Sequence, residues 1–332
     1  MNPRILPVLA VLLAACRSGG PDPVPALVAP LASRPPEPPP AGLAELSTLW
    51  NFDDPAASET RFRDAAARAK ERGARGYEAE AWTQVARAEA LQKRCEDAHA
   101  TLAVVEGMLR PEHPAAIVRW NLEKGRTLRS SGRPKDAEPF FVTAWDRASA
   151  AGDLGLALDA AHMVALTVEG ERPDEALSWA NRAIALAEAS SDPAARGWLA
   201  PLYNNTGWTC FDRGDFGRAL DLWQKAVPLR EKGGDAAALR IARWNVARCL
   251  RALKRPGDAV KLLETLRTEC EVAGKPDGFV FEELAENALV KGDAEAAKPY
   301  FQRAYELLKD DPDLASDKAR LERLRTAAGS VK

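Results

Sequence analysis

The chain has 332 residues, a formal net charge of -2 and a charged fraction of 28%, so no strong overall charge draws it to nucleic acid or to an anionic membrane surface. Alanine, leucine, arginine and glutamate dominate, and all four favour helix. Runs that alternate valine, isoleucine, threonine and aromatic residues are absent. An all-α protein that makes no use of nucleic acid is therefore expected.

Residues 1–15 have the layout of a secretory signal peptide. Arg4 gives a minimal basic start, and Ile5–Leu13 is an apolar stretch too short to span a bilayer. Leu13-Ala14-Ala15-Cys16 follows directly and resembles the lipobox of bacterial lipoproteins. This resemblance implies cleavage before Cys16 and acylation of that residue, which together give more than the single acyl chain that binds membranes only marginally. The alternative is an ordinary secretory signal in which the cysteine is incidental.

Residues 16–42 are expected to be a disordered, proline-rich tether. Nine prolines crowd into this segment, and proline lacks the N–H that a helix needs, so an extended spacer with a reach of at most roughly 80 Å is favoured. Plain disorder without a spacer role is the alternative. Arg17 stands where the lipoprotein family carries Asp for retention in the inner membrane. The resemblance therefore implies the outer membrane of a Gram-negative cell, with the protein facing the periplasm or the cell surface.

A skeleton of small and bulky residues recurs about every 40 residues through residues 43–311. Each copy has an alanine, a bulky residue four positions later and a small or apolar residue three positions after that. Full copies start at Ala98, Ala137, Ala219, Ala259 and Ala297, and weaker ones at Ser58 and Ala176. In five copies a small residue lies twelve positions earlier: Ala86, Gly125, Gly207, Ala247 and Ala285. Turn residues separate the two positions, so each unit reads as helix, tight turn, helix, with the bulky residue filling the gap between neighbouring repeats.

This pattern resembles the tetratricopeptide repeat, whose consensus is W-x2-L-G-x2-Y, then A-x3-F, then P. Residues 203–226 carry it as Tyr203, Thr206-Gly207, Cys210, Ala219, Trp223 and Ala226. The resemblance implies an α-solenoid of about six to seven helix-turn-helix repeats over residues 43–311. The period of about 40 departs from the usual 34 and implies longer helices. Residues 312–328 are expected to form an amphipathic capping helix, or alternatively a helix that lies on a membrane.

In tetratricopeptide arrays the first helix of each pair lines the concave face, and the resemblance implies a partner-binding groove there. The expected groove residues are Arg119, Arg126, His162, Asn204, Asn205, Trp208, Trp244, Arg248, Arg251, Glu282 and Glu286. Arginine binds carboxylates, asparagine binds backbone groups and tryptophan supplies apolar area, so a protein or peptide with acidic groups suits such a groove. The alternative is that the tryptophans pack between helices and the arginines are solvated.

No catalytic, metal-binding or cofactor motif stands out. His162 is a lone histidine on a helix, and such residues are more often structural than catalytic. The five cysteines show no CxxC spacing, which argues against a zinc or redox site. Cys210 and Cys249 occupy nearly equivalent places in adjacent repeats, where they form either a disulfide or two buried thiols.

The favoured function is a non-enzymatic, membrane-anchored scaffold that binds another envelope protein or peptide. One alternative is an enzyme or accessory factor acting on an envelope polymer such as peptidoglycan, with His162, Arg126 and nearby glutamates in its site. Another is a sensor for a small ligand. Repeat solenoids usually act by presenting a surface, which favours the scaffold.

Overall fold

The computed structural model describes residues 38–311, 314 and 317–329. The predicted signal peptide at residues 1–15, the lipidation site Cys16 and residues 17–37 of the tether lie outside the described residues. Within the described part the chain forms helices and turns without a strand, as the composition predicts. It divides into two compact units between Leu202 and Tyr203: an N-terminal unit of residues 38–202 and a C-terminal unit from residue 203 onward.

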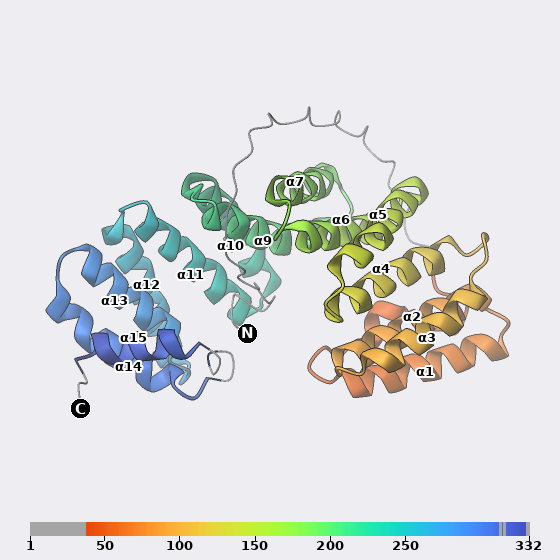
Figure 1. Ribbon diagram of the computed structural model, residues 1–332, viewed down its shortest axis with the longest axis horizontal. Coiled ribbons are helices and arrows are strands. Elements are labelled where there is room, and N and C mark those ends of the chain that lie inside the picture. The colour runs from red at the N-terminus through yellow and green to blue at the C-terminus, as the bar shows by residue number, and fades with distance from the viewer. Residues whose placement is uncertain (1–37, 312–313, 315–316, 330–332) are drawn as a thin grey trace. The chain divides into compact units, whose positions relative to one another are not determined.

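The N-terminal unit begins with a 3-10 helix and continues with α-helices up to the start of α9 (Figure 1). The elements are η1 (Leu46–Leu49), α1 (Pro55–Glu71), α2 (Arg75–Leu91), α3 (Cys95–Met108), α4 (Pro114–Ser130), α5 (Pro134–Ala151), α6 (Leu154–Val168), α7 (Pro173–Ala189), α8 (Pro193–Gly197) and α9 (Leu199–Asp212). The C-terminal unit contains most of α9, then α10 (Phe216–Gly233), α11 (Ala236–Ala252), α12 (Pro256–Val272), α13 (Gly278–Val290), α14 (Ala294–Leu308) and α15 (Lys318–Ala327).

Successive helices form helix-turn-helix pairs, so each unit is a tetratricopeptide-like solenoid. The pairs in the described residues are α2–α3, α4–α5, α6–α7, α9–α10, α11–α12 and α13–α14. Six pairs agree with the six to seven repeats that the sequence predicts. The first helices of neighbouring pairs also touch, as α2 does with α4 and α11 with α13. The first helices therefore form one side of each unit.

The turns within the pairs have the chemistry that the sequence indicates. Gly214 has a φ of 80°, in the left-handed region where a side chain is costly. Asp215 then caps α10, and its Oδ1 accepts a hydrogen bond from the Arg218 backbone N at 3.2 Å. In two other turns a lysine replaces the glycine: Lys93 has a φ of 63° and Lys254 a φ of 58°. The turn geometry is thus kept even where the residue is unfavourable.

The repeating small residues let a bulky side chain lie directly on the first helix. A Cβ added at Gly207 would lie 2.4 Å from Nε1 of Trp223, and one added at Gly125 would lie 2.6 Å from Cε1 of Phe141. Both bulky residues are fully buried. Each ring lies against the glycine of its own pair, because only glycine leaves room for it. The bulky residues of the skeleton also pack between neighbouring repeats, as predicted: Leu102 is buried in one cluster with Ala116 and Trp120 of the next pair.

An N-terminal strap of residues 41–52 covers the start of the N-terminal unit. Arg72 Nη1 donates a hydrogen bond to the Ala41 carbonyl at 2.9 Å, Tyr77 Oη to the Ala44 carbonyl at 2.6 Å, and Arg61 Nε to the Leu49 carbonyl at 2.7 Å. Leu46 is buried in the same core cluster as Phe62. Side chains of α1 and α2 thus hold the strap by its backbone.

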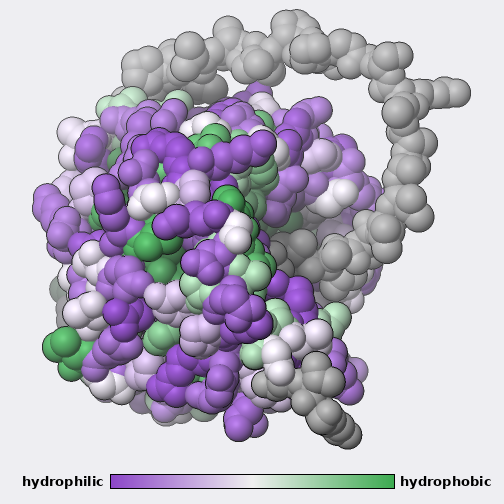
Figure 2. Space-filling model, turned by 90° about the vertical axis from the view of Figure 1, so that its left-hand side faces the viewer, coloured by the Kyte–Doolittle hydropathy of each residue, from purple (hydrophilic) through white to green (hydrophobic). Residues whose placement is uncertain are grey.

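Helix α15 covers the other end of the C-terminal unit, as the predicted capping helix does. Leu314 and Leu324 are buried in one cluster with Phe301 and Leu308 of α14. The helix begins at Lys318, later than the expected start of the segment at residue 312. From the side of α13–α15 the surface is largely hydrophilic, with small hydrophobic areas (Figure 2). No helix of the described residues has the length and apolarity to cross a membrane.

Candidate functional site

The predicted groove residues lie on the first helices of the pairs. We call this side of each unit its first-helix face. In the N-terminal unit it comprises Glu80 and Arg87 of α2, Arg119, Glu123 and Arg126 of α4, and Asp159 and His162 of α6. In the C-terminal unit it comprises Asn204, Asn205 and Trp208 of α9, Trp244, Asn245, Arg248 and Arg251 of α11, and Glu282, Glu283 and Glu286 of α13.

On the first-helix face of the N-terminal unit, arginines and carboxylates alternate across three helices. Arg119 Nε lies 2.9 Å from Oε2 of Glu80. Arg126 pairs with Asp159 of α6 through both carboxylate oxygens and with Glu123 of its own helix. Glu123 has only 2% of its side chain exposed. The two arginines predicted to bind a partner therefore hold neighbouring repeats together in this structure.

The charges in this row stabilise each other against burial. Burial alone would lower the pKa of the Arg126 guanidinium, but the charges of Asp159 and Glu123 raise it above its usual value. Burial alone would raise the pKa of Asp159, yet Arg126 and Arg87 hold it below its usual value. Both groups are therefore charged at neutral pH, and each depends on the other.

His162 lies next to this row without a role that its position makes obvious. Its ring centroid is 6.0 Å from that of Trp198. Burial lowers the pKa of His162 to about 4; the charge of Asp159 opposes this shift, and those of Arg126 and Arg129 add to it. The imidazole is therefore neutral at physiological pH.

The depressed pKa of His162 predicts a specific pH dependence of stability. The ordinary value is 6.5 and the folded value about 4, so between these pH values the unfolded chain binds more protons. The contribution is fully present above pH 6.5 and is lost as pH falls toward 4. In His162→Gln, the slope of unfolding free energy against pH is expected to flatten in this window by up to about 1.4 kcal/mol per pH unit. Urea unfolding between pH 7 and 4 measures the slope, and equal slopes in both proteins would contradict the assignment.

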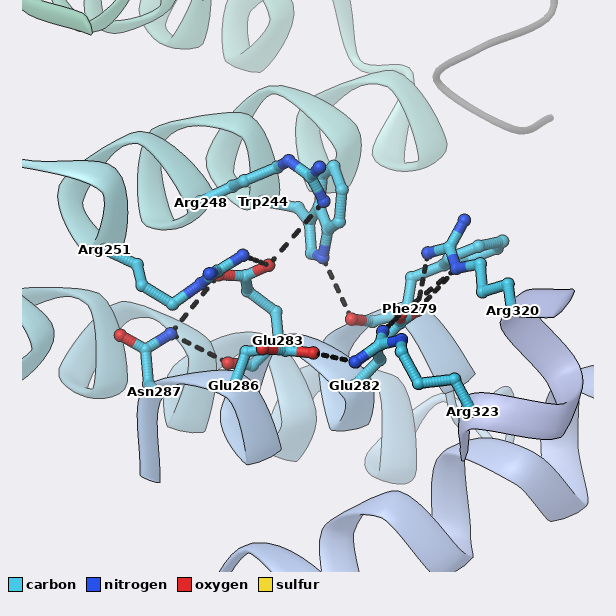
Figure 3. Close-up of polar contacts among 10 residues, drawn as sticks. All are labelled: Trp244, Arg248, Arg251, Phe279, Glu282, Glu283, Glu286, Asn287, Arg320 and Arg323. Atoms are coloured by element: carbon cyan, nitrogen blue, oxygen red, sulfur yellow. Dashed lines mark hydrogen bonds and ion pairs between the residues drawn. The ribbon is translucent and has the colours of Figure 1, made fainter. Parts of the chain in front are cut away.

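On the first-helix face of the C-terminal unit, α13 presents three carboxylates between the arginines of α11 and those of α15 (Figure 3). Arg251 pairs with both oxygens of Glu283, which has 2% of its side chain exposed. Burial raises the pKa of Glu283, although Arg251 acts against this. Trp244 is buried in the same region, and its Nε1 donates a hydrogen bond to the Phe279 carbonyl at 3.0 Å.

The other two carboxylates of α13 face the capping helix. Arg320 binds both oxygens of Glu282, and Arg323 binds Glu282 and Glu286 (Figure 3). Glu282 is 6% exposed. The two glutamates predicted to contact a partner are thus paired with arginines of α15.

Trp208 lies at the centre of an aromatic cluster that keeps part of its surface exposed. Its ring centroid is 5.0 Å from that of Trp223 and 5.7 Å from that of Phe211. The Arg248 guanidinium lies 5.7 Å from the Trp208 ring centroid and 5.4 Å from that of Trp244, at distances typical of cation–π contacts. Asn205, one turn earlier on α9, is also partly exposed.

The structure therefore separates the predicted groove residues into two groups. Arg119, Arg126, Arg251, Glu282 and Glu286 take part in ion pairs between helices, and Trp244 is buried. Asn204, Asn205, Trp208 and Arg248 come together around one partly exposed ring. Arg248 belongs to both groups, because its Nη1 also lies 3.9 Å from Oε2 of Glu283. His162 belongs to neither group. Sequence reasoning missed the carboxylate partners Glu80, Glu123, Asp159 and Glu283. The separation of 39 residues between Glu80 and Arg119 is close to the repeat period and was a usable signal. The separations of Asp159 and Glu283 from their arginines are shorter, at 33 and 32 residues, and Glu123 is only three residues from Arg126.

The cysteines behave as buried thiols. Cys210 and Cys249 are both free and buried, so the disulfide alternative is not realised in this structure. Burial raises the pKa of Cys249 to about 11. Among the residues that the structure describes, no group of three histidine, cysteine or acidic side chains is placed to hold a metal ion.

Comparisons with known proteins identify solved structures with a similar fold. No protein-family model matches the chain, and neither does any curated protein. Among solved structures, a STAND signal-transduction ATPase with a tetratricopeptide repeat sensor from Pyrococcus horikoshii aligns with a TM-score of 0.65 and 14% identity over 83% of this chain. This chain spans only 42% of that protein. The apo form of RapI aligns with a TM-score of 0.65 and 13% identity, covering 84% of this chain and 80% of RapI. These likenesses establish a tetratricopeptide-like fold.

Proposed function

We propose that the protein is a non-enzymatic scaffold that binds a protein or peptide with acidic groups through the first-helix face of its C-terminal unit. The observation that carries this proposal is the partly exposed Trp208, which lies beside the Arg248 guanidinium and one helical turn after Asn205 on α9. A rigid aromatic ring with polar groups around it is typical of residues that dominate binding energy in protein interfaces.

The contrast with the N-terminal unit supports this choice of surface. There the arginines of the first helices are already bound to carboxylates of the same chain. A partner that used them would have to break those pairs and leave a buried charge, which is costly. At Trp208, by comparison, a partner gains contact with a partly exposed ring. Arg248 beside it contacts Glu283 at 3.9 Å, but Glu283 keeps its closer pair with Arg251 when Arg248 turns to a partner.

We also propose that the chain is anchored to the outer membrane through acylated Cys16. Support comes from the lipobox-like sequence Leu13-Ala14-Ala15-Cys16 and from the proline-rich segment that follows it. Such an anchor would hold the binding surface near the membrane while leaving it free to reach partners. In Cys16→Ser we expect the full chain to leave the membrane fraction and to lose incorporation of a labelled fatty acid. Retention of both properties would contradict the anchor.

Partner binding is tested with a photoreactive amino acid placed at Asn205 of the full chain in intact cells. We expect one partner, identified by mass spectrometry, to be captured reproducibly from this position. It should not be captured from Gln224, an exposed residue of the second helix α10. With the purified partner, Trp208→Ala should raise the dissociation constant by about tenfold or more, as expected for a central aromatic contact.

The matched control is Trp179→Ala in the N-terminal unit. Trp179 is also partly exposed and lies against an arginine, Arg182, but it belongs to the second helix α7. Its replacement should leave partner affinity unchanged. Equal capture from Asn205 and Gln224, or equal loss of affinity in both tryptophan variants, would refute binding at this face.

A further inference from the structure

We infer that the C-terminal unit contains an oxyanion-binding site formed by Asn205, Trp208 and Arg248, which takes a carboxylate or phosphate group of the ligand. This inference rests on the proposed function, because it names the chemical group that the same face recognises. The evidence is the unpartnered Trp208 N–H, the chain of amides that ends at Asn205 and the position of Arg248 over the Trp208 ring.

The Trp208 indole N–H is a buried donor without a partner. The indole N–H groups of Trp120, Trp223 and Trp244 donate to backbone carbonyls of Leu102, Asn204 and Phe279, at 2.9, 3.1 and 3.0 Å. Trp208 Nε1 is shielded as well, yet it has no acceptor among the residues that the structure describes. A buried donor left in this state destabilises the fold, because it has lost its hydrogen bond to water. Folded proteins rarely keep such groups, so an acceptor from outside the fold is indicated.

A chain of amides ends at Asn205, one helical turn before Trp208 on α9. Asn245 Nδ2 donates to Asn204 Oδ1 at 2.9 Å, and Asn204 Nδ2 donates to Asn205 Oδ1 at 3.0 Å. Both hydrogen bonds run in one direction, so the amides polarise one another and end in the Asn205 N–H groups. Within the described part of the chain, Asn205 Nδ2 has no acceptor. Asn205 and Trp208 are three residues apart on α9 and therefore share one side of the helix.

The site offers donors and a positive charge to a ligand. The Arg248 guanidinium lies over the Trp208 ring, and its side chain is 22% exposed. Its Nη1 is also 3.9 Å from Oε2 of Glu283, which binds Arg251 more closely. The two arginines thus carry one positive charge more than the carboxylate they share. The unpaired acceptor at the other end of the amide chain, Asn245 Oδ1, belongs to a residue without exposed surface and is out of reach of a ligand. A group with acceptors alone satisfies this set, and a charged oxygen makes the stronger hydrogen bonds. A carboxylate and a phosphate both meet these requirements.

Access to Trp208 Nε1 requires a small side-chain movement. The atom has essentially no exposed surface, although the ring is partly exposed. Arg248 is a long side chain that covers this ring. When it turns toward an entering oxyanion, it uncovers the ring and donates to the same group. The site therefore forms around the ligand with the backbone of α9 and α11 unchanged.

The test is an NMR titration of the full chain labelled with ¹⁵N-tryptophan, using sodium acetate and sodium phosphate as probes and sodium chloride at equal ionic strength as the reference. Loss of one indole signal in Trp208→Phe assigns the Trp208 resonance. We expect that resonance to shift and saturate with acetate, phosphate or both, while that of Trp120 in the N-terminal unit stays in place. A preference for acetate would identify a carboxylate ligand, and a preference for phosphate a phosphorylated one.

The decisive variant is Asn205→Asp, which replaces a donor by a negative charge at nearly constant shape. It should raise the dissociation constant of the probe by about tenfold or more. Gln224→Glu adds the same charge to the exposed side of α10 and should leave it unchanged. An unmoved Trp208 signal, or one that shifts equally with chloride, would overturn the oxyanion site. Because partner capture from Asn205 is measured separately, that result would leave the scaffold proposal standing, and failed capture with a positive titration would do the reverse.

Discussion

Replacing Arg126 by methionine is expected to lower the unfolding free energy of the N-terminal unit by about 3–5 kcal/mol, the usual cost of removing one partner from a buried ion pair. Asp159 and Glu123 both bind this guanidinium, and Glu123 is almost fully buried. Methionine keeps the volume but leaves two carboxylates that repel each other in a poorly hydrated place. Urea unfolding followed by circular dichroism measures the loss.

Two comparisons make this result interpretable. Arg133→Met removes an exposed pair with Asp136 in the same unit and should cost no more than about 0.5 kcal/mol. The triple variant Arg126→Met, Glu123→Gln, Asp159→Asn should recover part of the lost stability, because the two carboxylates no longer repel each other. Recovery is incomplete because Arg87 then loses its pair with Glu123. If Arg126→Met and Arg133→Met cost the same, the row of charges has no special role in holding the helices together.

Gly207→Ala is expected to destabilise the C-terminal unit by about 1–3 kcal/mol, the range for overpacking a core. The added methyl group would lie 2.4 Å from Trp223 Nε1, which is far below a van der Waals contact. Relief requires Trp223 to move, and this breaks its hydrogen bond to the Asn204 carbonyl. The alanine also takes away conformational freedom from the unfolded chain, which partly offsets the cost. Thermal and urea unfolding both report the difference.

The matched control is Gly217→Ala on α10. A Cβ at Gly217 meets no atom within 4 Å, so this change should stabilise the helix by about 0.5–1 kcal/mol. Opposite signs for two glycine-to-alanine changes in one repeat would show that the repeat depends on the close approach at Gly207. A neutral or stabilising Gly207→Ala would disprove that dependence.

The fold could be predicted from the sequence because the residues that pack together within a repeat recur at a fixed, short spacing. Gly207 and Trp223 are sixteen residues apart, and the same spacing recurs in every full copy of the skeleton, so the paired helices were recognisable. The sequence did not predict that each bulky ring lies directly against the glycine of its own pair. A spacing shows that two positions belong together, but it does not show which face of a side chain meets which helix.

The candidate site was only partly accessible to such reasoning. Residue type suggested that Arg126 and Trp208 are alike, since both stand on first helices and both are common in interfaces. The structure separates them through their partners: Arg126 is bound by carboxylates from its own and the next first helix, whereas the Trp208 N–H has no acceptor in the described residues. Partner choice depends on side-chain placement between repeats, and the spacing of a single sequence does not reveal it.

The strap at residues 41–52 has a mechanical consequence. Three of its backbone carbonyls accept hydrogen bonds from side chains of α1, of its C-cap and of α2. The pairs, in chain order, are Ala41 with Arg72, Ala44 with Tyr77 and Leu49 with Arg61. A force that pulls on residue 38 loads these hydrogen bonds in chain order. They therefore break one at a time, starting at Ala41. Each freed residue lengthens the chain by up to about 3.4 Å. The strap can therefore extend under load before the force reaches α1.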